Sequence, residues 1–308
     1  MSDATSGFLE AAVRTATPLA LAALGETISQ RSGVVNVGLE GIILAGAFGA
    51  LVGGYPAPII GGEGSLLAGY AAAVGCGMLL ATLFATMVVS LRANQIITGT
   101  ALTLFAAGLT GTLYRAGYGT AGAALALPVA ESIPVPLLAG LPLIGRAFFA
   151  QPPTTLLLYL LLPLAWLLLT RTHAGLGLRA VGEHPEAAVA AGISPARVRW
   201  AALMLAGALG GLSGATLVLE QSGTFSEGIS AGRGFIAIAI VVLARWSALG
   251  VGAAALLFGA ASALQFLIQS MGVRLPYQLP LALPYIVTLV MLAVSGRRAR
   301  APAALGRD

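Results

Sequence analysis

The chain alternates between long apolar stretches and short polar or glycine-rich breaks from one end to the other. Most apolar stretches have about the length that an α-helix needs to cross the hydrocarbon core of a membrane. The pattern therefore predicts an all-α fold, a polytopic transmembrane helical bundle formed by one integral membrane domain over residues 1–308. The predicted spans cover residues 9–29, 34–54, 65–91, 94–114, 154–171, 198–220, 233–244, 248–270 and 278–296.

Two of these spans open with polar and glycine-rich residues. The second begins with "SGVVNVGLEG", which places Asn36 and Glu40 at membrane depth and predicts a broken helix, because glycine permits non-helical backbone there. The seventh has a similar broken approach from residue 222, with the sequence "SAGRGFIAIA". Broken helices in corresponding positions indicate a transport site, although two glycine-rich segments in a chain with 41 glycines also match by chance.

Polar residues in these breaks are the candidates for a translocation pathway. An ionisable side chain at membrane depth costs about 2.5 to 3.5 kcal/mol, so it is expected to face a cavity or a protein partner. We therefore expect Asn36 and Glu40 to line a polar path; alternatively, Glu40 lies near a helix end and pairs with Arg31. A second polar group closes the sixth span and adds three candidates: Glu220, Gln221 and Phe225. An ordinary loop between two spans would contain such residues as well.

The long connection 172–197 contains a short helix with clear boundaries. Pro185 and Glu186 in the first turn, an alanine-rich core and then Gly192 predict a helix at residues 185–191. This helix is too short to cross a membrane, so it is expected at the membrane surface. It is either a protrusion that docks in a partner's groove or an amphipathic connector.

Glycines in the sixth span predict close helix packing. They form two overlapping pairs with the GxxxG spacing: Gly207 with Gly211, and Gly210 with Gly214. Small residues at this spacing allow two helix backbones to approach each other closely in a membrane.

Composition excludes several function classes. Of the 308 residues 58% are apolar and 9% charged, and all 16 basic residues are arginine. Without a lysine the chain has no Walker phosphate loop, so it cannot itself be a P-loop ATPase. His173 and His184 lack further ligands at metal spacing. We therefore expect no enzyme activity and no cofactor.

The arginines also predict the orientation in the membrane. If the spans alternate and the tail 297–308 is cytoplasmic, eleven of the 16 arginines lie inside, which agrees with the positive-inside rule. The N-terminus is then expected outside. This bias accounts for the basic pI of about 9.9, so we expect membrane lipids as partners and no nucleic acid.

Three motifs carry a resemblance to a known family. They are "GETISQRSGVVNVGLEGIILAGAFGA", "LRAVGEHPEAAVAAGIS" and "GALGGLSGA". In this combination they resemble the permease subunits of bacterial ABC importers in the ribose and branched-chain amino acid group, most closely the nucleoside and simple-sugar branch. The resemblance extends over nearly the whole chain. It implies a permease domain in the bacterial inner membrane that takes up nucleosides or simple sugars.

The resemblance also implies partners and site residues. A cytoplasmic coupling helix would dock on a separate ABC ATPase, and its residues are Glu183, His184, Pro185, Glu186, Ala187 and Gly192. The broken second helix corresponds to Asn36, Gly38, Glu40 and Gly41. Further implied partners are a longer paralogous permease in a heterodimer and an extracytoplasmic substrate-binding protein or lipoprotein. The residues alone leave an alternative, an ion-coupled secondary transporter without an ATPase, in which Glu40 carries the ion.

Overall fold

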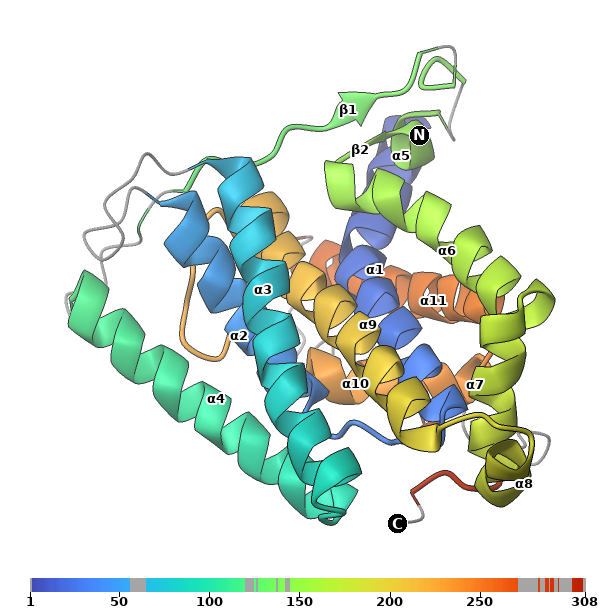
Figure 1. The fold of residues 1–308 in the computed structure, drawn as a ribbon. Coiled ribbons are helices and arrows are strands. Elements are labelled where there is room, and N and C mark those ends of the chain that lie inside the picture. The colour runs from blue at the N-terminus through green and yellow to red at the C-terminus, as the bar shows by residue number, and fades with distance from the viewer. Residues whose placement is uncertain are drawn as a thin grey trace.

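The computed structural model describes residues 2–55, 65–119, 125, 127–136, 138–141 and 145–270, scattered positions between 282 and 293, and 301–306. These residues form a helical bundle (Figure 1). The elements, in chain order, are α1 (Ser2–Arg31), α2 (Leu39–Gly54), α3 (Leu66–Ala85), η1 (Thr86–Ser90), α4 (Gln95–Tyr118), β1 (Ile133–Pro134), α5 (Gly145–Phe149), β2 (Ala150–Gln151), α6 (Pro153–Arg171), α7 (His173–Glu183), α8 (Pro185–Ala190), α9 (Pro195–Ala215), η2 (Thr216–Ser222), α10 (Arg233–Leu243) and α11 (Ala248–Ser270). The elements η1 and η2 are π-helical turns that continue α3 and α9.

Six helical stretches in the described part are long and apolar enough to cross a membrane. They are Thr5–Arg31, Leu66–Ser90, Gln95–Tyr118, Pro153–Arg171, Pro195–Ser222 and Ala248–Gln269. Two further apolar helices, α2 and α10, are shorter. Most of the predicted span 278–296 lies outside the described residues. The chain is thus a multi-pass helical membrane protein.

The breaks predicted in two helices are confirmed, with one corrected boundary. Helix α2 begins at Leu39 rather than at residue 34, because residues 32–38 form turns and irregular backbone. The approach to α10 over residues 223–232 is likewise non-helical. Helix α8 confirms the short helix expected in the long connection, and Gly192 after it has a φ of +80°, as a helix stop requires.

Helix α1 lies at the centre of the bundle, where it packs against α9, α10 and α11 (Figure 1). Helix α2 packs against α3 and α9 on the other side. The glycine stripe predicted for the sixth span lies at this crossing. A Cβ on Gly46 would lie only 2.5 Å from the Cα of Gly211, so the two backbones touch directly. The predicted close packing is confirmed.

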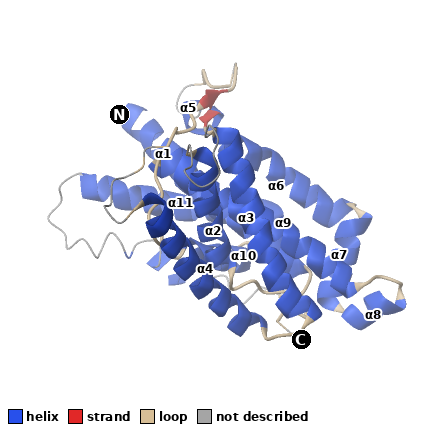
Figure 2. Ribbon diagram, turned by 60° about the vertical axis from the view of Figure 1, so that its left-hand side comes forward, coloured by secondary structure: helices blue, strands red, loops and turns tan. Residues whose placement is uncertain are grey.

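The two ends of the bundle differ in character (Figure 2). One end holds the N-terminus, the short α5 and a two-residue antiparallel pair in which Ile133 faces Gln151. This strand pair departs from the expected all-α fold, because a proline-rich connection rather than a span lies there. The opposite end holds α7, α8 and residues 301–306, and we call it the α8 end.

Candidate functional site

The non-helical segment 32–38 is held by hydrogen bonds from two helices. The backbone N–H of Asn36 donates to Glu26 Oε1 on α1 over 3.0 Å, and that of Val35 donates to Gln95 Oε1 on α4 over 2.8 Å. These bonds satisfy backbone groups that would otherwise be unpaired at membrane depth. A Cβ on Gly99 would lie 2.6 Å from the N of Gly38, so α4 and the segment are in direct backbone contact.

The side chain of Asn36 lies inside this framework without a partner. Its exposed fraction is 0%, and neither Nδ2 nor Oδ1 has a hydrogen-bond partner among the described residues. A buried amide without partners costs free energy, and it offers one donor group and one acceptor group to a polar ligand. The amide therefore has the chemistry to bind the hydroxyl groups of a solute.

Glu40 joins the two broken helices. Its carboxylate accepts the backbone N–H of Gly232 over 2.7 Å and that of Gly234 over 2.6 Å. Gly232 directly precedes α10 and Gly234 lies in its first turn, where a helix has unpaired N–H groups and a partial positive charge. Glu40 forms no ion pair with Arg31, which donates from Nε to the Trp246 carbonyl oxygen instead. The glutamate thus caps α10 and fastens it to the start of α2.

Glu26 is a buried carboxylate that sequence reasoning missed. Its Oε1 accepts from Gln30 Nε2 as well as from Asn36, and Gln30 Oε1 accepts from the indole of Trp246. Its Oε2 has no partner among the described residues. A signal existed, since a glutamate inside the apolar stretch of the first predicted span carries the same insertion cost as Glu40.

The candidates after the sixth span point in different directions. Glu220 is buried between helices, where Oε1 accepts from the Tyr70 hydroxyl over 2.7 Å and from the Thr154 N–H over 3.0 Å. Gln221 is exposed and donates to the Arg14 carbonyl oxygen. The structure therefore brings neither of them to the segment that contains Asn36.

Phe225 belongs to an aromatic cluster beside the C-terminal half of α2, away from Glu40. Its ring lies 5.7 Å from that of Phe48 and 5.2 Å from that of Tyr114, with centroids as reference points. A salt bridge between Arg115 and Glu227 ties the same loop to α4. Helix α2 therefore connects Phe225 at one end with Glu40 and Asn36 at the other.

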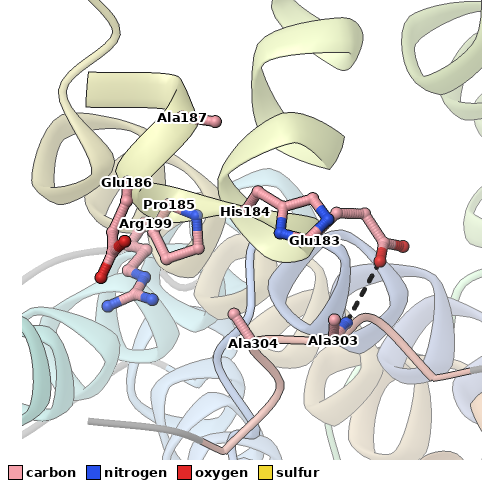
Figure 3. A pocket seen from close by; sticks show the side chains of 8 residues that line it. All are labelled: Glu183, His184, Pro185, Glu186, Ala187, Arg199, Ala303 and Ala304. Atoms are coloured by element: carbon pink, nitrogen blue, oxygen red, sulfur yellow. Dashed lines mark hydrogen bonds between the residues drawn. The ribbon is translucent and has the colours of Figure 1, made fainter. Parts of the chain in front are cut away.

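The residues expected to contact an ATPase lie together at the α8 end. Glu183, His184, Glu186 and Ala187 are exposed and Pro185 is half-buried. They line a cavity of about 400 Å³ together with Arg199, Ala303 and Ala304 (Figure 3). Within α8, only Ala188 is buried, so most of the short helix is open to a partner.

Two features of this end were not expected from the sequence. Residues 173–183 form α7, although glycine at three positions argues against a helix. Packing explains one of these glycines, since a side chain at Gly182 would collide with the carbonyl oxygen of Arg31. The second feature is the segment 301–306, which lies along this contact and which we call the tail segment.

The tail segment connects α7 with the segment 32–38. The N–H of Ala304 donates to the Gly182 carbonyl oxygen over 2.9 Å, and that of Gly306 donates to the Gly33 carbonyl oxygen over 3.2 Å. The N–H of Ala303 donates to the carboxylate of Glu183 over 3.2 Å (Figure 3). A continuous set of contacts therefore joins the exposed α8 to the segment that holds Asn36.

Comparison with known proteins places these features in a family. Residues 8–295 match the family described as branched-chain amino acid transport system / permease component. TsgC13 of Haloferax volcanii, a permease protein named for glucose ABC transport, is 39% identical over 281 residues, which cover 90% of this chain and 82% of that protein.

Two further relatives are named for nucleoside substrates. The nucleoside ABC transporter permease protein NupC of Lactococcus lactis is 37% identical over 296 residues, and the guanosine ABC transporter permease protein NupQ of Bacillus subtilis is 35% identical over 294 residues. Each alignment covers 94% of this chain and 92% of the relative. No solved structure matches the chain. The chain belongs to the family of permease components of branched-chain amino acid transport systems.

Proposed function

We propose that this permease carries nucleosides or simple sugars inward as one subunit of an ABC importer, and that separate ATPase subunits supply the energy. The observation that carries the proposal is the set of contacts from the exposed α8 through the tail segment to residues 32–38. Relatives named for nucleoside and glucose transport support the substrate class.

The mechanism follows from these contacts. An ATPase that closes on nucleotide would pull α8, and with it Gly182 and the tail segment. Since the tail segment is bonded to Gly33, the pull would reach the non-helical backbone around Asn36. The Glu40 cap would pass the displacement on to α10. Rocking of helices around a site between broken helices is a known way to alternate access in transporters.

We assign substrate contact to Asn36 as the first candidate. Nucleosides and sugars carry hydroxyl groups, and an amide offers them both a donor and an acceptor. Glu40, Phe225, Glu220 and Gln221 remain further candidates for the pathway. The hydrogen bonds of Glu40 and Glu220 favour structural duties for those two carboxylates.

The complete importer would contain further subunits. We infer a longer paralogous permease as the second half of a heterodimer, an ABC ATPase at the α8 end, and an extracytoplasmic substrate-binding protein or lipoprotein at the other end. This arrangement puts the N-terminus outside and the C-terminus in the cytoplasm. It also requires nine spans, in which α2, α10 and residues 278–296 complete the six longer helices.

The contrasting proposal is an ion-coupled transporter that works alone, with Glu40 as the ion carrier. The two backbone N–H groups bound to Glu40 weigh against it, because each carboxylate oxygen already takes part in holding the start of α10. Substrate uptake by this chain alone in liposomes, driven by a proton or sodium gradient, would establish the contrasting proposal.

Charge reversal on α8 tests the docking surface. We expect Glu186→Arg to abolish ATP-dependent nucleoside uptake and co-purification of the ATPase, because the exposed carboxylate would become a cation inside the interface. The measurements are uptake of radiolabelled nucleosides by cells and the amount of ATPase that co-purifies.

The matched control is Glu131→Arg, the same charge reversal on an exposed residue before β1, at the other end of the bundle. Both variants are compared at equal levels of membrane-inserted protein. Normal uptake by Glu186→Arg, or equal loss in both variants, would contradict the assignment of α8 as the ATPase contact.

A further inference from the structure

A small cavity at the α8 end has a lining that the transport proposal does not use. Its volume is about 110 Å³, and it lies where α1, α6, α7 and the start of α11 meet. Two arginines, two of the three tryptophans of the chain and two hydroxyl side chains line it: Arg31, Arg179, Trp166, Trp246, Thr170 and Ser247.

The charge of this lining favours an anion. Arg31 donates from Nε to the Trp246 carbonyl oxygen over 3.0 Å, and neither Arg31 nor Arg179 forms an ion pair within the described residues. The carboxylate of Glu183 attracts Arg31 electrostatically but forms no ion pair with it. This carboxylate accepts the N–H of Ala303 instead. Two like charges that face one cavity repel each other, and a phosphate between two guanidinium groups removes this repulsion through charge-assisted hydrogen bonds.

The position of the cavity points to a lipid rather than a free anion. Thr170 lies in the last turn of α6, at the end of a candidate span. Trp166 is 36% exposed one turn earlier, and tryptophan is enriched at the level of the lipid headgroups. From there, large apolar side chains of α6 continue toward the middle of the bundle, with Leu164 and Leu160 exposed by 53% and 63%.

The same helix offers room for an acyl chain on another face. An apolar groove of about 370 Å³ lies between α1, α6 and α9, and it is lined by Leu24, Ile28, Leu161, Leu168, Leu205 and Leu209. The groove and the cavity share the C-terminal half of α6. Phosphate binding therefore rests on the two arginines of the cavity, and the groove adds apolar surface for lipid chains at the same end of α6.

We propose that the cavity binds the phosphate of an anionic phospholipid, with Arg31 and Arg179 as its ligands and Trp166 at the membrane interface. The bound phosphate links α1 with α7, the helix that leads into α8. An anionic lipid thereby holds the ATPase-docking region against the bundle. The site stands independently of the transported substrate.

The test measures lipid retention by the full-length chain in detergent, using native mass spectrometry with phosphatidylglycerol and phosphatidylcholine as probes. We expect preferential retention of phosphatidylglycerol, and about a fivefold loss of this retention in Arg179→Gln, since one arginine near a membrane surface contributes roughly that factor. Arg31 is left intact, because it also supports the Trp246 backbone.

Arg171→Gln is the matched control, because Arg171 is an exposed arginine at the end of α6 and does not line the cavity. It is expected to retain phosphatidylglycerol within twofold of the unchanged protein. Equal retention of the two lipids, or equal losses in the two variants, would overturn the proposal. Displacement of the lipid by glycerol phosphate at equal concentration would also overturn it, since the site would then select a soluble phosphate.

Discussion

Two buried glutamates, Glu26 on α1 and Glu220 on η2, lie near the ends of helical stretches that pack against each other, yet their surroundings differ. Both oxygens of Glu220 are bonded, by the Tyr70 hydroxyl and by the N–H and hydroxyl of Thr154. These donors lie on two regular helices, α3 and α6. Every polar atom of this carboxylate is satisfied, so its surroundings favour one arrangement of the helices.

The surroundings of Glu26 are less complete. One oxygen holds Gln30 and the backbone of Asn36, while the other oxygen and the whole Asn36 amide have no partner among the described residues. The Asn36 backbone belongs to a non-helical segment rather than to a helix. The comparison teaches that one buried carboxylate fixes the bundle, whereas the other holds a segment that retains hydrogen-bonding capacity for a ligand.

The largest expected effect is on stability at Glu220. Replacement by leucine removes three hydrogen bonds and leaves the buried Thr154 donors and the partly buried Tyr70 hydroxyl without this acceptor. We expect a loss of about 2 to 4 kcal/mol in the free energy of unfolding. Thermal unfolding in detergent measures it, and the neighbouring exposed Gln221→Leu serves as the control. A Glu220→Leu protein as stable as the control would remove the proposed difference between the two glutamates.

An effect on transport rather than stability is expected at Asn36. Alanine in its place deletes an amide that has no partner among the residues that the structure describes, so the unfolding temperature should stay close to that of the unchanged chain. Nucleoside uptake at low substrate concentration should fall by about tenfold, because the substrate loses a hydrogen-bonding group. The comparison is made with the complete importer in proteoliposomes. Unchanged uptake would exclude Asn36 from the pathway.

The smallest effect is expected at Glu26. In Glu26→Gln the side-chain oxygen can still accept from Gln30 and Asn36, and the new amide group replaces an oxygen without a partner. We expect less than about 1 kcal/mol of change in stability. Thermal unfolding in detergent measures the stability of Glu26→Gln in parallel with that of Glu220→Leu. A loss as large as at Glu220 would show that Glu26 fixes the bundle equally.

Much of the helical framework could be predicted from local sequence. Apolar runs placed α3, α4, α6, α9 and α11 close to their observed positions, because length and hydrophobicity alone decide whether a helix can span a membrane. Pro185 and Gly192 set the limits of α8 through their fixed or left-handed backbone angles. Glycine around Asn36 and Glu40 likewise predicted the break before α2.

The candidate site was predictable only in part. Asn36 and Glu40 were found from the cost of polar groups at membrane depth, but the partner of Glu40 lies 192 residues away at Gly232. Helix α7 forms despite three glycines that lower its intrinsic helix propensity, and one of them, Gly182, is required by the close approach to Arg31. No local pattern indicated that residues 301–306 contact the non-helical segment 32–38 before α2.

From the sequence alone one can therefore derive a membrane bundle, the places where two of its helices break, and a short surface helix. Each of these properties depends on neighbours along the chain. Only the tertiary structure decided that Glu40 caps α10, that Glu220 is saturated while Asn36 is not, and that Arg31 and Arg179 share a cavity. Hydrogen bonds and charges act between groups that meet in space, and residues far apart in the sequence meet only after the helices have packed.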